Sequence, residues 1–339
     1  MSTDNTPSFD AAPAASSVTR RHVLALAASF PLAACGGGSG GDSPASVPAP
    51  PAGSPPAGSP PANPPPADPP ASSPDTGTPA PKNKSAKRGI AYDLKATADV
   101  AALAPGVSWW YNWASSTTVT PAVATANAMD FQPMLWNGTF NDAQIIAGLK
   151  ATPAVKYLLL LNEPNLHGQA TMTPAAAAAL WPRYEAIAAS TGVKLVGPQI
   201  TWGTLEGYAD PVVWLDAFYA AYRAANGNRD PRIDHLAFHW YDYGLNDQLK
   251  RLEKYGKPFW VTEFANWHVG DGAAQIDTVA KQKAQMTDMV ATCEGRADVI
   301  RYAWFTGRWD NDTHYSSLLG ATGVLTELGQ HYMSLPYTA

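Results

Sequence analysis

This chain of 339 residues is poor in cysteine and in charged side chains. It holds two cysteines, and Asp, Glu, Lys and Arg together make up 15% of its residues. A framework of several disulfides is therefore excluded, and Cys293, with no histidine partner nearby in the sequence, is expected to be a buried, inert thiol. The net charge is −5 and no basic cluster is longer than the one at 82–88, so nothing indicates nucleic-acid binding.

The apolar run near the N-terminus, at 23–34, is too short to cross a bilayer, which takes roughly 20 residues. It follows two arginines at 20–21 and ends in "LAAC", whose cysteine is Cys35. Charged, apolar and small residues in this order are typical of a secretory signal, and the paired arginines indicate twin-arginine export. The "LAAC" resembles a bacterial lipobox. We therefore expect 1–34 to be a signal peptide and Cys35 to be lipidated.

A protein with these signals would be exported and held at the bacterial outer membrane or cell surface through its N-terminal lipid only. Secretion without an anchor is the alternative. The segment 35–85 follows, and 16 of the 31 prolines lie between 44 and 81. Such a composition cannot form a hydrophobic core and favours an extended, disordered linker. The lipid and linker would hold the folded domain, 86–339, away from the membrane.

The folded domain alternates short apolar segments with helical patterns. Eight segments have the length and composition of buried strands: 88–92, 107–111, 131–136, 157–161, 194–198, 235–240, 258–263 and 299–304. This alternation predicts a (β/α)8 TIM barrel, an α/β fold, with one or more shortened helices, particularly between the second and third strands. The alternative is a doubly wound open sheet, which usually has a glycine-rich turn after its first strand, and "GIAYDLK" has none.

Polar and aromatic side chains gather where these segments end. They are Trp109, Trp110, Tyr111, Asn112 and Trp113 at the second, Trp136 and Asn137 at the third, Asn162 and Glu163 at the fourth, Gln199 and Trp202 at the fifth, His239, Trp240, Tyr241 and Asp242 at the sixth, Glu263, Asn266 and Trp267 at the seventh, and Trp304 and Arg308 at the eighth. In barrel enzymes the active site lies at the C-terminal ends of the strands. We therefore expect the site there.

Two glutamates carry the main chemical hypothesis. By strict alternation Glu163 shares a strand face with Leu159 and Leu161, and Glu263 shares one with Phe259 and Val261. If those apolar partners fill the barrel, both glutamates point inward at its rim. Two carboxyl groups that flank one bond are what glycoside hydrolysis requires, one as a proton donor and the other ionised.

The motifs "RGIAYD", "WWYNW", "FQPMLW", "LLNEPN", "LVGPQI", "DHLAFHWYD", "PFWVTEFANW" and "YAWFTGR" occur in this order over 88–335. Together they resemble glycoside hydrolase family 128, the endo-β-1,3-glucanases of clan A. The resemblance implies an acid/base at Glu163 and a nucleophile at Glu263. It further implies that Asn162 contacts the 2-hydroxyl of the reacting sugar and that Trp304 forms the floor of its subsite. His239 and Tyr241 would orient the nucleophile or line the site.

The remaining tryptophans fall into two groups. Trp181, Trp214 and Trp260 are expected to pack helices against the sheet. Candidates for sugar-stacking platforms are Trp109, Trp110, Trp113, Trp136, Trp202, Trp240 and Trp267. A metal held by His235 and His239 is not expected, because on one strand these residues lie about 13 Å apart.

Taken with this resemblance, which implies an endo-β-1,3-glucanase, the sequence predicts a monomeric, cofactor-free retaining enzyme that cleaves laminarin- or curdlan-type glucan by double displacement. Its carboxyl groups would lie about 5–5.5 Å apart. One alternative is a surface glycan-binding lipoprotein without catalysis. Another is a clan A glycosidase acting on β-1,4 or β-1,6 linkages. Endo or exo action, chain-length preference and the membrane leaflet stay open.

Overall fold

The computed structural model describes residues 84–270 and 272–337. The predicted signal peptide, the lipidated Cys35 and nearly all of the predicted linker lie outside the described residues. Lys84 and Ser85, which the sequence assigned to the linker, contact the folded domain: Lys84 donates to three backbone carbonyls and Ser85 Oγ donates to Glu294. Among the described helices, none combines the length and apolar character needed to span a bilayer.

Nine parallel strands form one sheet in the described part of the chain, in the order β3-β2-β1-β9-β8-β7-β6-β5-β4. They are β1 (Arg88–Ala91), β2 (Trp109–Tyr111), β3 (Asp130–Phe131), β4 (Met134–Leu135), β5 (Tyr157–Leu160), β6 (Lys194–Ile200), β7 (His235–Trp240), β8 (Phe259–Phe264) and β9 (Val299–Trp304). The edge strands β3 and β4 are separated only by Gln132 and Pro133, so the sheet curls until its two edges meet. The predicted TIM-barrel fold is confirmed.

The third predicted strand, 131–136, is divided into β3 and β4. Pro133 lies between them, and proline has no N–H with which to continue a ladder. Gln132 N donates to Trp110 O on the β2 side at 2.9 Å, and Pro133 O accepts from Leu159 N on the β5 side at 3.0 Å. The prediction of one unbroken strand is wrong in this detail, although the same segment links both neighbours.

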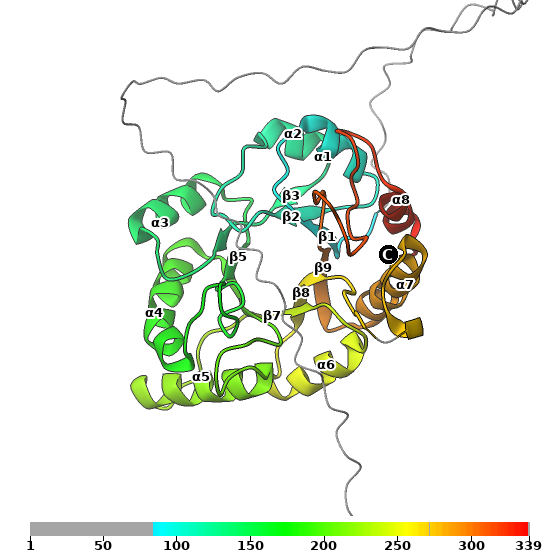
Figure 1. Ribbon diagram of the computed structural model, residues 1–339. Coiled ribbons are helices and arrows are strands. Elements are labelled where there is room, and N and C mark those ends of the chain that lie inside the picture. The colour runs from blue at the N-terminus through cyan, green and yellow to red at the C-terminus, as the bar shows by residue number, and fades with distance from the viewer. Residues whose placement is uncertain (1–83, 271, 338–339) are drawn as a thin grey trace, which may run out of the picture. The chain divides into compact units, whose positions relative to one another are not determined.

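Within 84–270 and 272–337, eight α-helices alternate with the strands and surround them (Figure 1). They are α1 (Thr97–Leu103), α2 (Pro121–Ala126), α3 (Asp142–Ala151), α4 (Pro174–Thr191), α5 (Pro211–Ala225), α6 (Leu245–Leu252), α7 (Val279–Gly295) and α8 (Glu327–Ser334), with two 3-10 helices, η1 (Glu253–Tyr255) and η2 (Gly272–Ala274). Thr173 and Asp210 cap α4 and α5, each with proline at the first helical position, as the sequence indicates. The sequence left α2 uncertain and did not predict α8.

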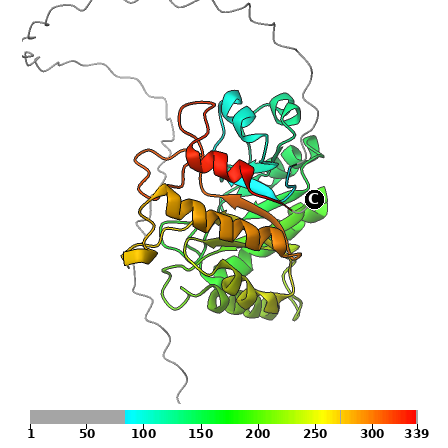
Figure 2. The ribbon, with the colours of Figure 1, turned by 90° about the vertical axis from the view of Figure 1, so that its right-hand side faces the viewer.

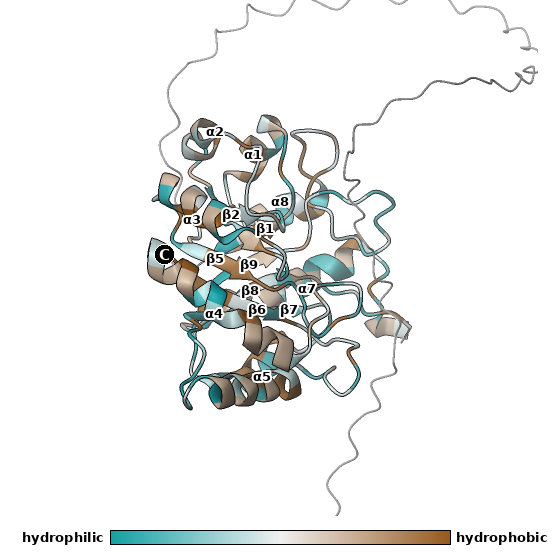
Figure 3. Ribbon diagram, turned by 90° about the vertical axis from the view of Figure 1, so that its left-hand side faces the viewer, coloured by the Kyte–Doolittle hydropathy of each residue, from teal (hydrophilic) through white to brown (hydrophobic). Residues whose placement is uncertain are grey.

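Two layers of apolar side chains form the core. The inner layer fills the barrel with residues such as Trp109, Leu159 and Ala303. The outer layer lies between the strands and the helices, where Trp181 and Trp214 pack as expected. Figure 3 shows hydrophobic colouring in the sheet between the labels β5 and β9, and hydrophilic patches on the surrounding helices.

Trp260 contradicts its predicted place in the outer layer. It lies inside the barrel, with its ring centroid 5.1 Å from that of Trp109 and 4.8 Å from that of Tyr157. Arg301 covers the same rings, with its guanidinium carbon 4.9 Å from the Trp260 centroid. Large aromatic side chains therefore close the end of the barrel at which the strands begin, opposite their C-terminal ends.

The beginning and the end of the domain are joined by Arg88. This buried side chain donates to the Tyr302 hydroxyl and to the backbone carbonyls of Tyr332, Leu335 and Pro336. Next to it, α7 and α8 lie side by side (Figure 2) and an ion pair between Lys283 and Glu327 links them. Arg88 thus fastens β1 to the C-terminal helix.

Replacing Arg88 by Met should lower the free energy of unfolding by about 3–5 kcal/mol, because several buried acceptors lose a charged donor. Urea unfolding measures the change. The matched control is Lys250→Met, since Lys250 pairs with Asp247 at the surface with side chains 58% and 77% exposed, and it should change stability by no more than about 0.5 kcal/mol. Equal small effects of both substitutions would contradict the role of Arg88.

Candidate active site

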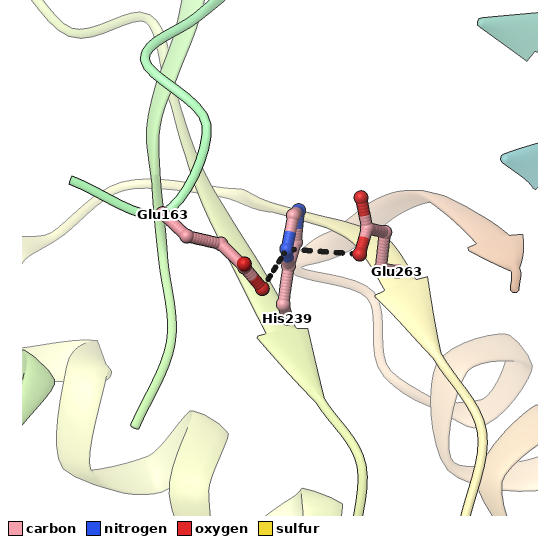
Figure 4. A group of neighbouring side chains, drawn as sticks. All are labelled: Glu163, His239 and Glu263. Carbon is pink, nitrogen blue, oxygen red and sulfur yellow. Dashed lines mark hydrogen bonds and ion pairs between the residues drawn. The ribbon is translucent and has the colours of Figure 1, made fainter. Parts of the chain in front are cut away.

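Three side chains from different strands meet at the C-terminal ends of the sheet. Glu163 follows β5, His239 lies near the end of β7 and Glu263 near the end of β8. His239 Nδ1 lies 2.9 Å from Glu163 Oε1 and 3.3 Å from Glu263 Oε2, between the two carboxylates (Figure 4). All three are buried, with 5%, 0% and 4% of their surface exposed. Glu163 and Glu263, which are one hundred residues apart in the sequence, therefore lie on either side of the same imidazole ring.

The backbone after β5 turns Glu163 inward. Leu159 faces the barrel interior, but Leu161 packs in the outer layer, so the predicted common face of Leu159, Leu161 and Glu163 is wrong. Leu161 and Glu163 have φ values of 53° and 44°, in the left-handed region that non-glycine residues rarely adopt. The Glu163 N–H donates to Gln199 O at 2.8 Å and holds this turn against β6.

A different irregularity directs Glu263. Phe259 and Val261 pack in the outer layer, so their predicted common face with Glu263 is also wrong. The register between β8 and β9 shifts between Val261 and Phe264, and the register between β7 and β8 shifts between Phe238 and His239. Such bulges re-aim side chains next to active sites. They bring Glu263 and His239 to the inner face.

Three donors hold the Glu263 carboxylate. Tyr111 Oη and Trp113 Nε1 each donate to Oε1 at 2.8 Å, and Tyr241 Oη makes a short hydrogen bond to Oε2. They come from β2, the segment after β2 and the segment after β7. Hydrogen bonds to an ionised acceptor are the strong ones. Both oxygens of the Glu263 carboxyl group therefore accept hydrogen bonds.

Burial and neighbouring charges shift the pKa values of Glu163 and His239. Burial raises the pKa of Glu163, and the charge of Glu263 raises it further, although the hydrogen bond and charge of His239 act in the opposite direction. Burial by itself lowers the pKa of His239, but the charges of Glu263 and Glu163 outweigh it, so the pKa is raised. Both shifts favour the protonated forms of Glu163 and His239.

The same three residues bring one oxygen or nitrogen atom each within 4.8 Å of one another, a spacing at which a cation can also be held. The Glu263 oxygens already accept three hydrogen bonds. We therefore interpret the group as proton-sharing and assign no metal to it.

Asn162 lies beside Glu163, as predicted for a residue that contacts a sugar hydroxyl. It is 3% exposed, its Nδ2 donates to Gln169 Oε1 at 2.9 Å, and its Oδ1 has no hydrogen-bond partner among the described residues. A buried acceptor without a partner is costly unless a ligand or water satisfies it. Asn162 thus has an unused acceptor next to the carboxyl group.

A cluster of aromatic rings lies beside the Glu263 carboxylate. Trp267 stacks on Tyr241 with centroids 4.0 Å apart, and Phe305 contacts Trp113, Tyr241 and Trp267. Trp309 adds a further ring against Trp267. Of the predicted sugar platforms, Trp113 and Trp267 therefore lie in the ring cluster with Tyr241, whose hydroxyl reaches Glu263.

Three other predicted platforms lie outside this ring cluster in the described residues. Trp136 is half-buried against the inner layer, and Trp202 is 42% exposed with its Nε1 donating to Gln248. Trp240 stacks on Phe238 in the outer layer and its Nε1 donates to the Tyr243 carbonyl. None of these three contacts the glutamates through a hydrogen bond in the described residues.

Trp304, Trp110 and Trp109 contradict their predicted contact with substrate, since each is 0% exposed. Trp304 Nε1 donates to Ser316 O at 2.8 Å in the outer layer, and Trp110 packs on Phe131 there. Strand alternation explains the error for the last strand, because Ala303 faces inward and Trp304 therefore faces outward. The aromatic ring at this rim position is Phe305, one residue beyond the predicted strand.

Four residues of this region received no role from the sequence: Tyr111, Gln199, Phe305 and Trp309. Tyr111 and Gln199 lie at strand ends, so the sequence predicted their position near the site but not the side chains that they contact. Gln199 Oε1 lies 3.1 Å from His239 Nε2. Trp309 belongs to a long segment after β9, for which strand patterns give no placement.

Comparison with known proteins identifies the class of this arrangement. The family described as glycosyl hydrolase catalytic core matches residues 89–332. A crystal structure of a subgroup II endo-β-1,3-glucanase of glycoside hydrolase family 128 from Pseudomonas viridiflava is 59% identical, with a TM-score of 0.74, over 76% of this chain and 100% of that chain. A subgroup I enzyme from Amycolatopsis mediterranei, in complex with laminaritriose, is 27% identical with a TM-score of 0.57, over 74% of this chain and 99% of that one.

A curated relative, alkali-sensitive linkage protein 1 of Schizosaccharomyces pombe, is 27% identical over 268 residues. The match covers 74% of this chain and 45% of the relative, so the chain spans less than half the length of that protein. The fold and the paired glutamates thus occur in a glycoside hydrolase catalytic domain. Within that class, the chain belongs to glycoside hydrolase family 128.

The buried position of Trp304 leads to a stability prediction. Trp304→Phe should lower the free energy of unfolding by about 1–3 kcal/mol, because the Ser316 carbonyl loses its donor and a cavity forms. The control is Trp202→Phe at an exposed position, expected to change stability by no more than about 0.5 kcal/mol. Thermal and urea unfolding measure both. Unchanged stability of Trp304→Phe would contradict its assignment to the core.

Proposed function

We propose that the barrel hydrolyses β-1,3-glucan by double displacement, with Glu163 as acid/base and Glu263 as nucleophile. The observation that carries the proposal is the convergence of the two carboxyl groups, each with an oxygen within 4.8 Å of the other. Inverting glycosidases keep their carboxyl groups about 6.5–9.5 Å apart to make room for water. The shorter spacing supports a retaining mechanism.

In the first step Glu163 gives its proton to the glycosidic oxygen while Glu263 attacks the anomeric carbon. The bond to the leaving sugar breaks, and an ester forms between Glu263 and the remaining glycosyl unit. Glu163 then removes a proton from water, whose oxygen attacks the anomeric carbon and releases Glu263. The raised pKa of Glu163 supports its role as the donor, and the hydrogen bonds to Glu263 support an oriented, ionised nucleophile.

The choice of substrate rests on the relatives. The Pseudomonas viridiflava and Amycolatopsis mediterranei proteins are described as endo-β-1,3-glucanases, and the latter holds laminaritriose. The aromatic rings beside Glu263 suit the apolar faces of sugar rings. A capture protein without catalysis would also use such rings, but it gains nothing from a nucleophile held by three donors. Hydrolysis is therefore the function that the site supports best.

Glu163→Gln and Glu263→Gln should each lower the rate of laminarin hydrolysis by about 10²–10⁴-fold, because each removes a group that acts in both steps. The measurement is release of reducing ends. The matched control is Glu253→Gln, since Glu253 lies in η1 before β8, at the opposite end of the barrel, and is half-exposed. It should leave the rate unchanged.

Cleavage that survives either substitution in the site would contradict these roles. A wild-type protein that binds laminarin without cleaving it would favour the capture function. Cleavage of β-1,4 or β-1,6 glucan in preference to laminarin would keep the mechanism and change the substrate.

Double displacement also fixes the stereochemistry of the product. Proton NMR during the first minutes of laminarin hydrolysis should show the new reducing end as the β anomer, before mutarotation mixes the two forms. Initial appearance of the α anomer would require single displacement by water and would contradict Glu263 as a nucleophile.

A further inference from the structure

Gln199, on β6, contacts both the main chain of Glu163 and the side chain of His239. Its carbonyl accepts from the Glu163 N–H at 2.8 Å, and its own N–H donates to Leu161 O at 3.0 Å. Its side-chain Oε1 lies 3.1 Å from His239 Nε2, and its Nε2 lies 3.4 Å from Met134 Sδ. Gln199 is 0% exposed. One buried residue therefore contacts both Glu163 and His239.

The thioether of Met134 defines the orientation of the Gln199 amide. A thioether sulfur has no hydrogen to donate and accepts only weakly, so it can face the amide NH2 group but cannot satisfy the amide oxygen. The oxygen consequently faces His239. Because that oxygen only accepts, His239 Nε2 must carry a hydrogen.

The other nitrogen, His239 Nδ1, faces acceptors too. The charged groups that act on His239 are Glu263 from β8 and Glu163 after β5. Tyr111 from β2 and Tyr241 after β7 direct their hydroxyls to Glu263, and Gln199 from β6 is neutral. With Nε2 already protonated, a second proton between Nδ1 and Glu163 Oε1 makes either an imidazolium next to a carboxylate or a neutral imidazole next to a carboxylic acid.

We propose that Gln199 is a positioning residue that fixes the protonated Nε2 of His239, so that Nδ1 and Glu163 jointly hold the acid proton of the reaction. This inference rests on the proposed function. In the glycosylation step the pair loses one proton to the leaving oxygen, and in the second step it regains one from water. The pair begins and ends each turnover with one shared proton, and the pKa of the pair limits activity at high pH.

The acceptor on Gln199 stabilises the charged imidazole, because a hydrogen bond to the charged form of a group favours that form. Without the acceptor the pair gives up its shared proton at a lower pH. A carboxylate in the same position would stabilise the imidazolium more strongly and shift that pH upward. If Gln199 only filled space, the two substitutions would not shift this pH in opposite directions.

The first test measures the wild-type protein. Nitrogen-15 NMR of histidine-labelled full-length chain, with the His239 signals assigned by their loss in His239→Asn, reports the protonation of each ring nitrogen separately. We expect Nε2 to stay protonated from pH 5 to 9 while Nδ1 titrates. A deprotonated Nε2 within this range would overturn the proposal, and this result does not depend on any activity.

The second test uses Gln199→Leu and Gln199→Glu. In Gln199→Leu the basic limb of kcat/KM on laminarin and the titration of Nδ1 should move to lower pH by about one unit, and in Gln199→Glu both should move to higher pH. The control is Gln132→Leu, which removes another buried amide, one whose Oε1 has no partner among the described residues, and should not move the limb.

Shifts in the same direction for both Gln199 variants, or no shift in variants that keep a cooperative thermal transition, would contradict the role of Gln199. If a variant does not fold, the wild-type titration still decides. If the protein cleaves no glucan, the proposed function fails while the NMR titrations still test the link between Gln199 and His239. The two failures are therefore distinguishable.

Discussion

Two buried carboxylates that face one imidazole are the constraint on which the rest of this structure depends. Two negative charges at this distance in a buried site repel each other strongly. Glu163 and Glu263 can share the site because His239 lies between them, within hydrogen-bond distance of Glu163, and because three donors surround Glu263. These groups come from β2, β5, β7 and β8, and only a sheet that curls until its edges meet brings those strands to one rim.

The site also depends on backbone geometry that opposes regular strands. Positive φ values at Leu161 and Glu163 and register shifts on both sides of β8 are local irregularities. Each of them interrupts the regular strand pairing locally and turns one functional side chain toward the site. The Arg88 contacts and the aromatic rings inside the barrel support the regular part of the fold, which keeps these irregular segments in place.

The alternation of eight apolar segments was enough to predict the barrel, because its strands are buried on both faces and are separated by capped helices. The positions of Glu163, His239, Tyr241 and Glu263 at strand ends were enough to predict that they meet. Strict alternation then gave the wrong partners for both glutamates and the wrong neighbours for Trp260. A bulge or a left-handed residue changes the face of every later side chain, and neither has a reliable signature in these segments.

The tryptophans show the same limit. An indole at a strand end can stack on a sugar or fill the core, and the choice depends on which face its residue occupies. Trp304 faces outward and its neighbour Phe305 lies with the site rings, although the sequence favoured the larger ring. The position of Gln199 at a strand end was predicted, but its role was not, since that role depends on a contact between side chains from two strands and on the sulfur of Met134.

The most direct measurement of the central claim is the site of covalent labelling. The protein would be incubated with a 2-deoxy-2-fluoro β-laminaribiosyl fluoride, which slows the second step, and then digested and sequenced by mass spectrometry. Double displacement at this site predicts one fluoroglycosyl group, attached to Glu263. A label on Glu163, or no label on a protein that hydrolyses laminarin, would contradict the assignment of the two carboxyl groups.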